Sequence, residues 1–415
     1  MNVRNIIMAI AGILCVSLPV RGGAQEADSL PAPDSADFIT VSFVTSAPSG
    51  RAIYSTLGHA TLRMECPAYE LDYCFSPEIA QPLSEAFSFF AGKARAGLIM
   101  ARTSDYLEAC RAEGRTVTAY PLNLTPDEKR ELWRLLDTKV AEGLYMEYDY
   151  LNRGCGIEAM SFVDMAIGRG RIGYGDVPAW LSGSRREIFF HDLEAFPWMR
   201  LFMMLMLGDE ADEEVPLEKK LMIPSDIAAA LADAEIVDTA GVRRPMLSGE
   251  PVVLYEPGAS CAPFPFPDPL WVFGAVLLWT VVLTWVQCRR PDAWRSGGRV
   301  TDGVLFVVQA VAGLFMAYLW WCSDLVATGW NRYDVPFNVL PLLVYVAGRV
   351  RPFPAAVWQK VYLVYGGVLA AFIVACVWLP CPDYPLWCLF GAMAVRCFYQ
   401  ACMNKRIRRN NKVKS

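Results

Sequence analysis

The last third of the chain alternates between long apolar stretches and short polar connections. The apolar stretches are 269–287, 303–322, 335–348, 360–380 and 384–403. A helix needs about 20 predominantly apolar residues to cross the hydrocarbon core of a bilayer, so all but the third have the length of a membrane span. The third stretch is shorter, and the distribution of charge has to decide whether it also crosses.

Basic residues are distributed unevenly over the connections. Segments 288–302, 349–360 and 404–415 hold four, three and six lysine or arginine residues, whereas the two other connections hold Arg332 alone. Loops on the cytoplasmic side of a membrane carry such an excess of basic residues. We therefore expect five transmembrane helices over 269–403, with the basic connections on the cytoplasmic side. If the third stretch turned back instead of crossing, the basic tail at 404–415 would end up outside, against the charge rule. We therefore expect the third stretch to cross and the tail to be cytoplasmic.

The start of the chain has the pattern of a secretory signal. Residues 1–24 combine the basic Arg4, an apolar run and a small-residue end at Ala24. The apolar run is marginal for a membrane span, which favours a cleaved signal over the alternative of an uncleaved anchor. Residues 25–37 are polar and contain proline, as in a linker. We expect the region from the linker to residue 268 to be exported.

Polar and apolar positions between the linker and the membrane part predict strands and then helices. Three segments have strand character, namely 38–46, 59–64 and 70–76, and the last two form a hairpin. His59, Thr61 and Arg63 share one face of the second strand. In LTPDEKRELW, Thr125 and Glu128 form a capping box with proline at the first helical position. A second helix starts near Cys155.

This mixture predicts an α+β domain over residues 38–205. A charged, partly helical extension and a proline-rich approach to the membrane follow at 206–268. The net charge of the 415-residue chain is only −5, and no basic surface suited to nucleic acid is visible. Its two histidines lie far apart and no CxxC spacing occurs, so we expect no metal site and no cofactor.

Cysteines of the exported region raise the question of chemistry. There are five of them: Cys66, Cys74, Cys110, Cys155 and Cys261. Cys66 and Cys74 flank a short turn and could pair in an oxidising compartment, and the odd number leaves one thiol over. Cys155 stands between Gly154 and Gly156 in YLNRGCGIEAM, at a helix start. A helix N-terminus lowers the pKa of a thiol, and flanking glycines let an acyl carbonyl approach the backbone.

A thiol nucleophile needs a base, and His59 at the start of a strand has a more suitable setting than His191 among aromatic residues. Either histidine could equally be a satisfied core or surface group. If Cys155 and His59 meet, the residues suit acyl transfer through a thioester, with His59 moving the proton. A third polar group would orient the imidazole, and Asp72 is the first choice, with Glu70 and Tyr73 as alternatives.

The backbone N–H groups of Cys155 and Gly156 would bind the oxyanion, because a helix start presents unpaired donors. We expect three side chains to support this site: Asn152, Arg63 and Tyr148. In the connection SDLVATGWNRYDVPFN, the residues Trp330, Asn331 and Arg332 lie at headgroup level. They suit either an interfacial belt of anchors or a loop that faces lipid headgroups.

Five segments of the sequence, in the same order along the chain, resemble the motifs of one bacterial family. They are YSTLGHATLRM, EGRTVTAYPLNLTPDEKRELW, YMEYDYLNRGCGIEA, FHDLEAFPWMRLFMMLMLG and LEKKLMIPSDIAAAL. Together with the apolar stretches, the likeness covers most of residues 38–345. The family is Lnb, the lipoprotein N-acyltransferases whose soluble part is called the Lnb N-terminal periplasmic domain. The resemblance implies a papain-like α+β fold of circularly permuted NlpC/P60 type, in which the histidine precedes the cysteine.

The resemblance implies a Cys-His pair at Cys155 and His59. It also implies transfer of an acyl chain from a phospholipid donor to the α-amine of a diacylglyceryl lipoprotein. Five spans favour this hypothesis, because the acyl donor lies in the bilayer. One alternative is an exported thiol hydrolase or amidase that acts on cell-wall peptide. The other is an inactive paralogue that serves as an envelope assembly or binding module.

Overall fold

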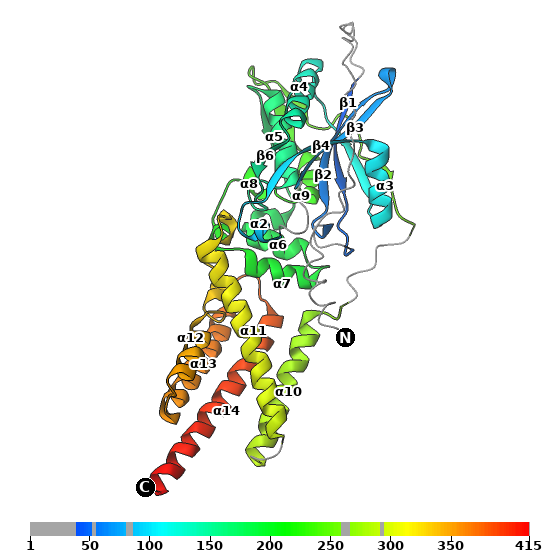
Figure 1. Cartoon of the computed structure of the whole chain (residues 1–415). Coiled ribbons are helices and arrows are strands. Elements are labelled where there is room, and N and C mark those ends of the chain that lie inside the picture. Colours follow the sequence, from blue (N-terminus) through cyan, green and yellow to red (C-terminus); the bar gives the residue numbers. More distant parts are fainter. Residues whose placement is uncertain (1–38, 52–54, 80–85, 259–265, 291–293, 415) are drawn as a thin grey trace. The chain divides into compact units, whose positions relative to one another are not determined.

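The structure is a computed structural model, and it describes the chain except for residues 1–38, 52–54, 80–85, 259–265, 291–293 and 415 (Figure 1). The expected signal at 1–24 and the linker at 25–37 lie outside the described residues. The chain divides into two compact units. The first comprises the chain up to Phe196, with Ala211–Phe264 and Asp324–Ala327. The second comprises Pro197–Glu210, Pro265–Ser323 and the chain from Thr328 onward.

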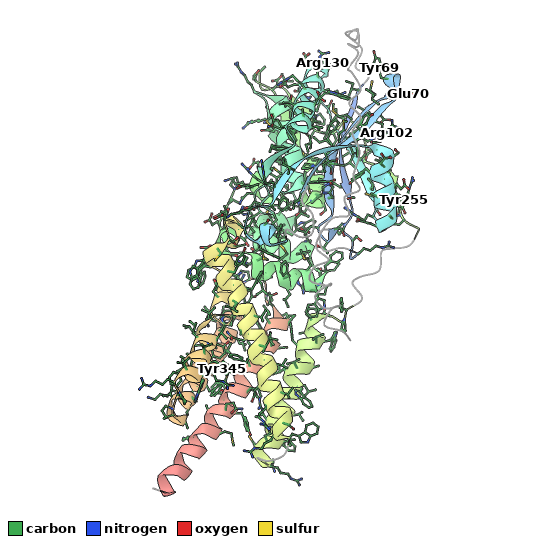
Figure 2. The ribbon with its side chains drawn as sticks, in the orientation of Figure 1. Tyr69, Glu70, Arg102, Arg130, Tyr255 and Tyr345 are labelled. Atoms are coloured by element: carbon green, nitrogen blue, oxygen red, sulfur yellow. The ribbon has the colours of Figure 1, made fainter. Side chains whose placement is uncertain are left out.

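A seven-stranded antiparallel sheet forms the centre of the first unit, in the order β10-β5-β1-β2-β3-β4-β6. Its strands are β1 (Thr40–Ser46), β2 (His59–Cys66), β3 (Leu71–Ile79), β4 (Arg95–Arg102), β5 (Val117–Pro121), β6 (Leu144–Glu147) and β10 (Val252–Tyr255). The expected hairpin is β2–β3, and its turn contains Glu70 in the left-handed conformation, at φ 56° (Figure 2).

The suggested Cys66–Cys74 disulfide is wrong. Both thiols are free and buried. The register of the hairpin explains why, because Cys74 pairs with Arg63 and Cys66 pairs with Leu71. The two cysteines therefore lie three positions apart along neighbouring strands. Burial raises the pKa of the Cys74 thiol to about 11, which makes it unreactive at neutral pH.

Helices pack on both sides of this sheet. In Figure 1, α3 (Thr103–Glu113) lies on one side, and α4 (Pro126–Glu142) and α5 (Cys155–Ile167) lie on the other. The capping box that the sequence predicts at the start of α4 is present. The remaining helices of this unit are α2 (Ala86–Phe90), α6 (Arg185–Asp192), α8 (Leu217–Lys220) and α9 (Pro224–Leu231), and a small sheet contains β7 (Arg171–Gly173), β8 (Glu235–Val237) and β9 (Arg243–Pro245).

The second unit is helical. Among the residues that the structure describes, four helices are long and apolar enough to cross a membrane. They are α10 (Pro269–Arg289), α11 (Arg295–Cys322), α13 (Ala355–Cys376) and the apolar part of α14 (Tyr384–Lys414). The third expected span is the shorter apolar helix α12 (Leu340–Val350). Its 11 residues rise only about 16 Å, roughly half of the hydrocarbon core. The unit also contains α7 (Pro197–Met206).

In the first unit, an acidic pair consists of Asp192 at the end of α6 and Asp226 in the first turn of α9. Asp226 is 1% exposed and accepts a hydrogen bond of 2.9 Å from Nε1 of Trp180. His191 stacks on the Trp180 ring, with the ring centroids 4.7 Å apart, and its Nδ1 lies 3.0 Å from Oδ1 of Asp192. Burial, and then the charge of Asp192, raise the pKa of the Asp226 carboxyl. The native state therefore favours protonated Asp226, which can donate a hydrogen bond to Asp192.

Replacing Asp226 with asparagine should stabilise the protein increasingly as the pH rises. A carboxyl whose pKa is raised on folding contributes stability below its unfolded pKa of about 3.9 and loses that contribution as the pH rises through the folded value. Asparagine resembles the protonated acid at every pH. We expect its advantage to be small near pH 4 and to grow by up to about 1.4 kcal/mol per pH unit toward the folded pKa.

Thermal unfolding of the purified full chain over this pH range measures the effect. Asp176→Asn is the control, because Asp176 is an exposed carboxylate in the same unit. Parallel pH profiles for wild type and Asp226→Asn would contradict the prediction.

Candidate active site

The start of α5 and the start of β2 lie against each other. Gly154 precedes α5 in an extended conformation, with φ −76° and ψ 168°, so the helix begins at Cys155. Hydrogen bonds from the backbone N–H groups of Ala60 and Gly156 favour the Cys155 thiolate. Ala60 directly follows His59, and the thiol therefore lies at the peptide group that joins His59 to Ala60, the first two residues of β2. The fold thus brings the two predicted residues to one place.

The ring of His59 has a different hydrogen-bond partner. Its Nε2 lies 2.5 Å from Oγ of Ser76, a residue of β3 that is 3% exposed. Among the described residues, no hydrogen bond joins the His59 ring to Cys155. In unliganded active sites this bond is often made only when substrate binds. Since Ser76 occupies Nε2, the other ring nitrogen, Nδ1, is left for the thiol proton.

Electrostatics keep both reacting groups neutral. Burial and the positive charge of Arg115 lower the pKa of His59 to about 3, so its imidazole is uncharged at neutral pH. Burial raises the pKa of the Cys155 thiol, although backbone N–H groups and Arg115 act in the opposite direction. The expectation of a lowered thiol pKa at the helix start is therefore wrong, because desolvation outweighs the helix terminus. The pair is a thiol with a neutral base.

Arg115, which the sequence did not single out, is the charge that both groups sense. It is 7% exposed, and its guanidinium donates to the carbonyl of Ala47 at 3.1 Å, to the carboxylate of Glu113 at 3.1 Å and to the hydroxyl of Ser46. These partners hold the charge in place just before β5. The sequence alone does not show that the arginine of EGRTVTAY is buried. Once it is buried, partners are expected, because arginine is almost never fully buried unless paired.

Asp72 does not reach His59. The register of the hairpin pairs Asp72 with Glu65, six residues from His59 along β2, a span of about 20 Å. Its carboxylate instead accepts hydrogen bonds from Nε and Nη2 of Arg63, at 2.7 and 2.8 Å, and from Thr103. Arg63 also pairs with Glu65. Asp72 and Arg63 thus form an ion pair nearer the turn of the hairpin, and Ser76 stands where Asp72 was expected.

Ser76 could have been found from the strand period. Alternate residues of β3 share one face, so Ser76 lies on the same face as Asp72, four positions closer to the open end of the hairpin. The Ser76 hydroxyl also bonds to the carboxyl of Glu78, whose pKa is raised chiefly by desolvation although the residue as a whole is exposed. Hydrogen bonds therefore link the His59 imidazole to the Ser76 hydroxyl and the Ser76 hydroxyl to the Glu78 carboxyl.

Of the predicted supporting residues, Tyr148 lies at the thiol, whereas Asn152 bonds to a residue outside the site. Tyr148 lies near the thiol, because the charge of Cys155 adds to burial in raising the pKa of its phenol. The side chain of Asn152 is engaged elsewhere, since its amide oxygen accepts a hydrogen bond of 3.0 Å from Arg185, which is 1% exposed. Asn152 therefore holds the loop before α5 in place.

The two glycines beside Cys155 have different roles. A Cβ atom on Gly156 would lie 2.5 Å from Cδ1 of Ile227, so glycine lets α9 pack against the start of α5. A Cβ atom on Gly154 would have no heavy atom closer than 3.8 Å. Of the two glycines, only Gly156 is required for close packing, and it also supplies one of the backbone N–H groups that favour the Cys155 thiolate.

The polar connection before α12 is only partly open to lipid. Trp330 is 49% exposed, but Asn331 is 2% exposed. The Asn331 amide donates to three backbone carbonyls at the end of α7, those of Met204, Leu205 and Leu207, at 3.0, 3.0 and 2.7 Å. Arg332 donates to the carbonyl of Pro380 and lies over the ring of Tyr333. Asn331 therefore acts as a cap that fixes α7 within the second unit, and its side chain does not face lipid.

Comparison with known proteins assigns both parts of the chain. The model of the Lnb N-terminal periplasmic domain matches residues 33–182, which include His59, Ser76 and Cys155. The model of the Lnb transmembrane domain matches residues 263–407, which include α10 to α13 and the apolar part of α14. Searches of curated proteins and of solved structures found no match. Among the described residues, no group of three or more His, Cys, Asp or Glu side chains could hold a metal ion.

Proposed function

The chain belongs to the Lnb family as a membrane protein with a periplasmic α+β domain, and from this premise we propose that it is an acyltransferase of the bacterial inner membrane. It would move an acyl chain from a phospholipid, through a thioester on Cys155, to the α-amine of a diacylglyceryl lipoprotein. The observation that carries the proposal is the neutral His59 beside a partly buried thiol at a helix start. The described residues of the same chain include four helices long and apolar enough to span a membrane.

The first half-reaction forms the thioester. His59 accepts the thiol proton while Sγ of Cys155 attacks an ester carbonyl of the phospholipid. The expected oxyanion donors, the backbone N–H groups of Cys155 and Gly156, would be joined by that of Ala60, because all three favour negative charge at the thiol. The ester C–O bond then breaks, and the imidazolium returns its proton to the leaving lysophospholipid oxygen. Ser76 and Glu78 would stabilise the imidazolium while it exists.

The second half-reaction forms the amide. The neutral α-amine of the lipoprotein attacks the thioester carbonyl, and His59 accepts a proton from the amine nitrogen. The C–S bond breaks, the thiolate leaves, and the imidazolium returns the proton to Sγ. The thiol and the neutral imidazole are regenerated, which agrees with a resting state in which neither group is charged.

Complementation tests the proposal. The chain would be expressed in a bacterium depleted of its own lipoprotein N-acyltransferase, with empty vector as the control. We expect the mass of the N-terminal peptide of an abundant lipoprotein to increase by one acyl chain. An unchanged mass despite membrane expression would overturn the proposal. Release of peptide fragments from purified cell wall would instead support the thiol hydrolase.

Replacing Ser76 with alanine should slow thioester formation roughly 10- to 100-fold, because a hydrogen bond to a charged group is worth roughly 1.5–3 kcal/mol. The loss should fall on kcat rather than on KM, since Ser76 orients and stabilises His59 without touching substrate. Ser76→Thr keeps the hydroxyl and should recover most of the rate. Ser42→Ala, at a buried serine of β1, is the matched control. Equal rates for Ser76→Ala and Ser42→Ala would rule out the positioning role.

A further inference from the structure

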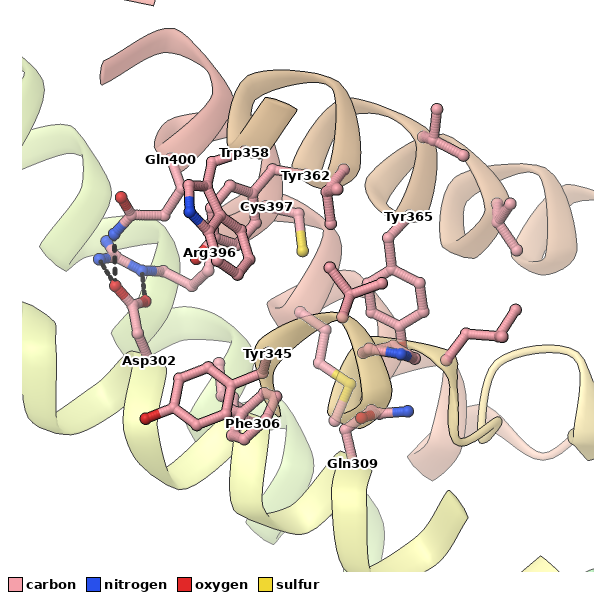
Figure 3. A pocket seen from close by; sticks show the side chains of 18 of the residues that line it. Asp302, Phe306, Gln309, Tyr345, Trp358, Tyr362, Tyr365, Arg396, Cys397 and Gln400 are labelled. Carbon is pink, nitrogen blue, oxygen red and sulfur yellow. Dashed lines mark hydrogen bonds and ion pairs between the residues drawn. The ribbon is translucent and has the colours of Figure 1, made fainter. Parts of the chain in front are cut away.

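A cavity of about 640 Å³ lies inside the second unit, between α11, α12, α13 and α14. This volume is within the range of ligand pockets, roughly 300–1,000 Å³. Most of the lining is apolar, and it includes Leu305, Phe306, Val344, Val361, Val368 and Met393. Figure 3 shows Phe306 and Tyr345 on one wall, with Tyr365 and Gln309 at the side away from Asp302. An apolar cavity between membrane helices suits a hydrocarbon chain from the surrounding bilayer.

Charged and polar groups gather at one end of the cavity. Arg396 is 4% exposed, and its Nε and Nη2 donate to Asp302 at 2.5 and 2.9 Å (Figure 3). Gln400 donates to the same carboxylate at 2.6 Å. The guanidinium also donates to Thr284 and Gln287, so this buried ion pair is well satisfied. The Arg396–Asp302 ion pair therefore adds no net charge to the cavity.

Lys360 makes this end positive. It lines the cavity near the start of α13, and it is exposed. In the described part of the chain, its ammonium group has no hydrogen bond or ion pair. The connection that precedes α13 carries Arg349 and Arg351, which belong to the same basic end of the helices. An unpaired cation at the mouth of an apolar cavity matches an amphiphile with an anionic head.

The far end of the cavity is closed by polar contacts within the protein. Gln309 is 3% exposed and donates a hydrogen bond of 2.6 Å to the carbonyl of Asn338, just before α12. Tyr365 donates to the carbonyl of Pro336 at 2.8 Å. At the side, a Cβ atom on Gly348 would lie 2.6 Å from the Trp358 ring, so glycine lets α12 pack against α13. The cavity is therefore built by specific contacts.

We propose that the cavity binds one anionic glycerophospholipid, with an acyl chain in the apolar interior and the phosphate at Lys360. This site goes beyond the proposed reaction, because it lies in the membrane unit at the basic ends of the helices and contains no residue of the thiol site. The lipid comes from the leaflet that meets the end of α10 and the start of α11 and α13. It would hold α11 and α12 against α13 and α14.

Native mass spectrometry of the delipidated full chain, titrated with phosphatidylglycerol or phosphatidylcholine, tests the site. We expect one phosphatidylglycerol to remain bound under conditions that strip the other lipids. Val361→Trp should remove it by filling the cavity. Leu363→Trp is the matched control, because Leu363 lies on the same helix, is 53% exposed and does not line the cavity. Equal binding by the two variants would mean annular lipid only and would overturn the proposal.

Lys360→Gln provides a second test that does not depend on whether Val361→Trp folds, because Lys360 is exposed. Removing one cation should lower affinity for phosphatidylglycerol about five-fold and leave phosphatidylcholine unaffected, since one Lys near a lipid head is worth about 1 kcal/mol. Unchanged preference for phosphatidylglycerol would overturn the assignment of Lys360. Binding is read without any acyl transfer, so failure here and failure of the proposed reaction are separate results.

Discussion

Cys155→Ala is expected to abolish transfer of an acyl chain to a lipoprotein amine while the protein stays folded. Alanine removes the Sγ atom that would form the thioester, and loss of a covalent nucleophile costs at least about 1,000-fold in rate. The substitution leaves the backbone and the Cβ atom of the first residue of α5 unchanged. The measurement is the rate of lipoprotein acylation by purified protein in phospholipid micelles. Wild-type rates in Cys155→Ala would exclude the thioester.

Cys110→Ser provides a matched control for this experiment. Cys110 is 3% exposed and packs in a cluster with Val44, Val117 and Ala119, away from the start of α5. We expect this variant to lose stability rather than acyl transfer per folded molecule. Intact mass after exposure to phospholipid should show one added acyl group on wild type, released by hydroxylamine. The same adduct on Cys155→Ala would locate the acyl group on another residue.

His59→Gln is expected to slow thioester formation by about 100- to 10,000-fold, the usual contribution of a general base. Glutamine preserves polar contact with Ser76 but cannot take the thiol proton at neutral pH. Because burial raises the pKa of Cys155, little thiolate exists without the base, which makes the loss large. His191→Gln is the control, since His191 is the other histidine and belongs to the Trp180 cluster.

The pH dependence carries a second part of this prediction. The folded pKa of His59 is lowered to about 3, so the imidazole stays neutral and able to accept a proton as the pH falls. We expect thioester formation in wild type to show no loss attributable to His59 between about pH 8 and pH 5, instead of halving near the ordinary histidine pKa of about 6.5. Single-turnover acylation must be followed, because the acceptor amine titrates at about 7.7–8.0. Halving near pH 6.5 would mean that His59 is hydrated and that Arg115 does not act on it.

Local patterns of the sequence predicted the elements that carry the candidate site. Alternation predicted the hairpin with His59 at its start, and the capping residues predicted the start of α4 at Pro126. The Gly-Cys-Gly turn predicted a helix that begins near Cys155, and apolar length predicted the four long spans. These features depend on a few neighbouring residues, because hydrogen bonding and side-chain period act within one or two turns.

Only the tertiary structure decided which side chains meet. Asp72 was the natural acid for His59 by residue type, but strand register sets it about 20 Å away along β2 and brings Ser76 instead. The pKa of Cys155 rises although a helix begins there, because burial depends on what α9 and β2 place around the thiol. Asn331 was expected at lipid headgroups, and three carbonyls of α7 hold it inside the protein. Register, burial and distant hydrogen bonds depend on residues far apart in the chain, so no local pattern contains them.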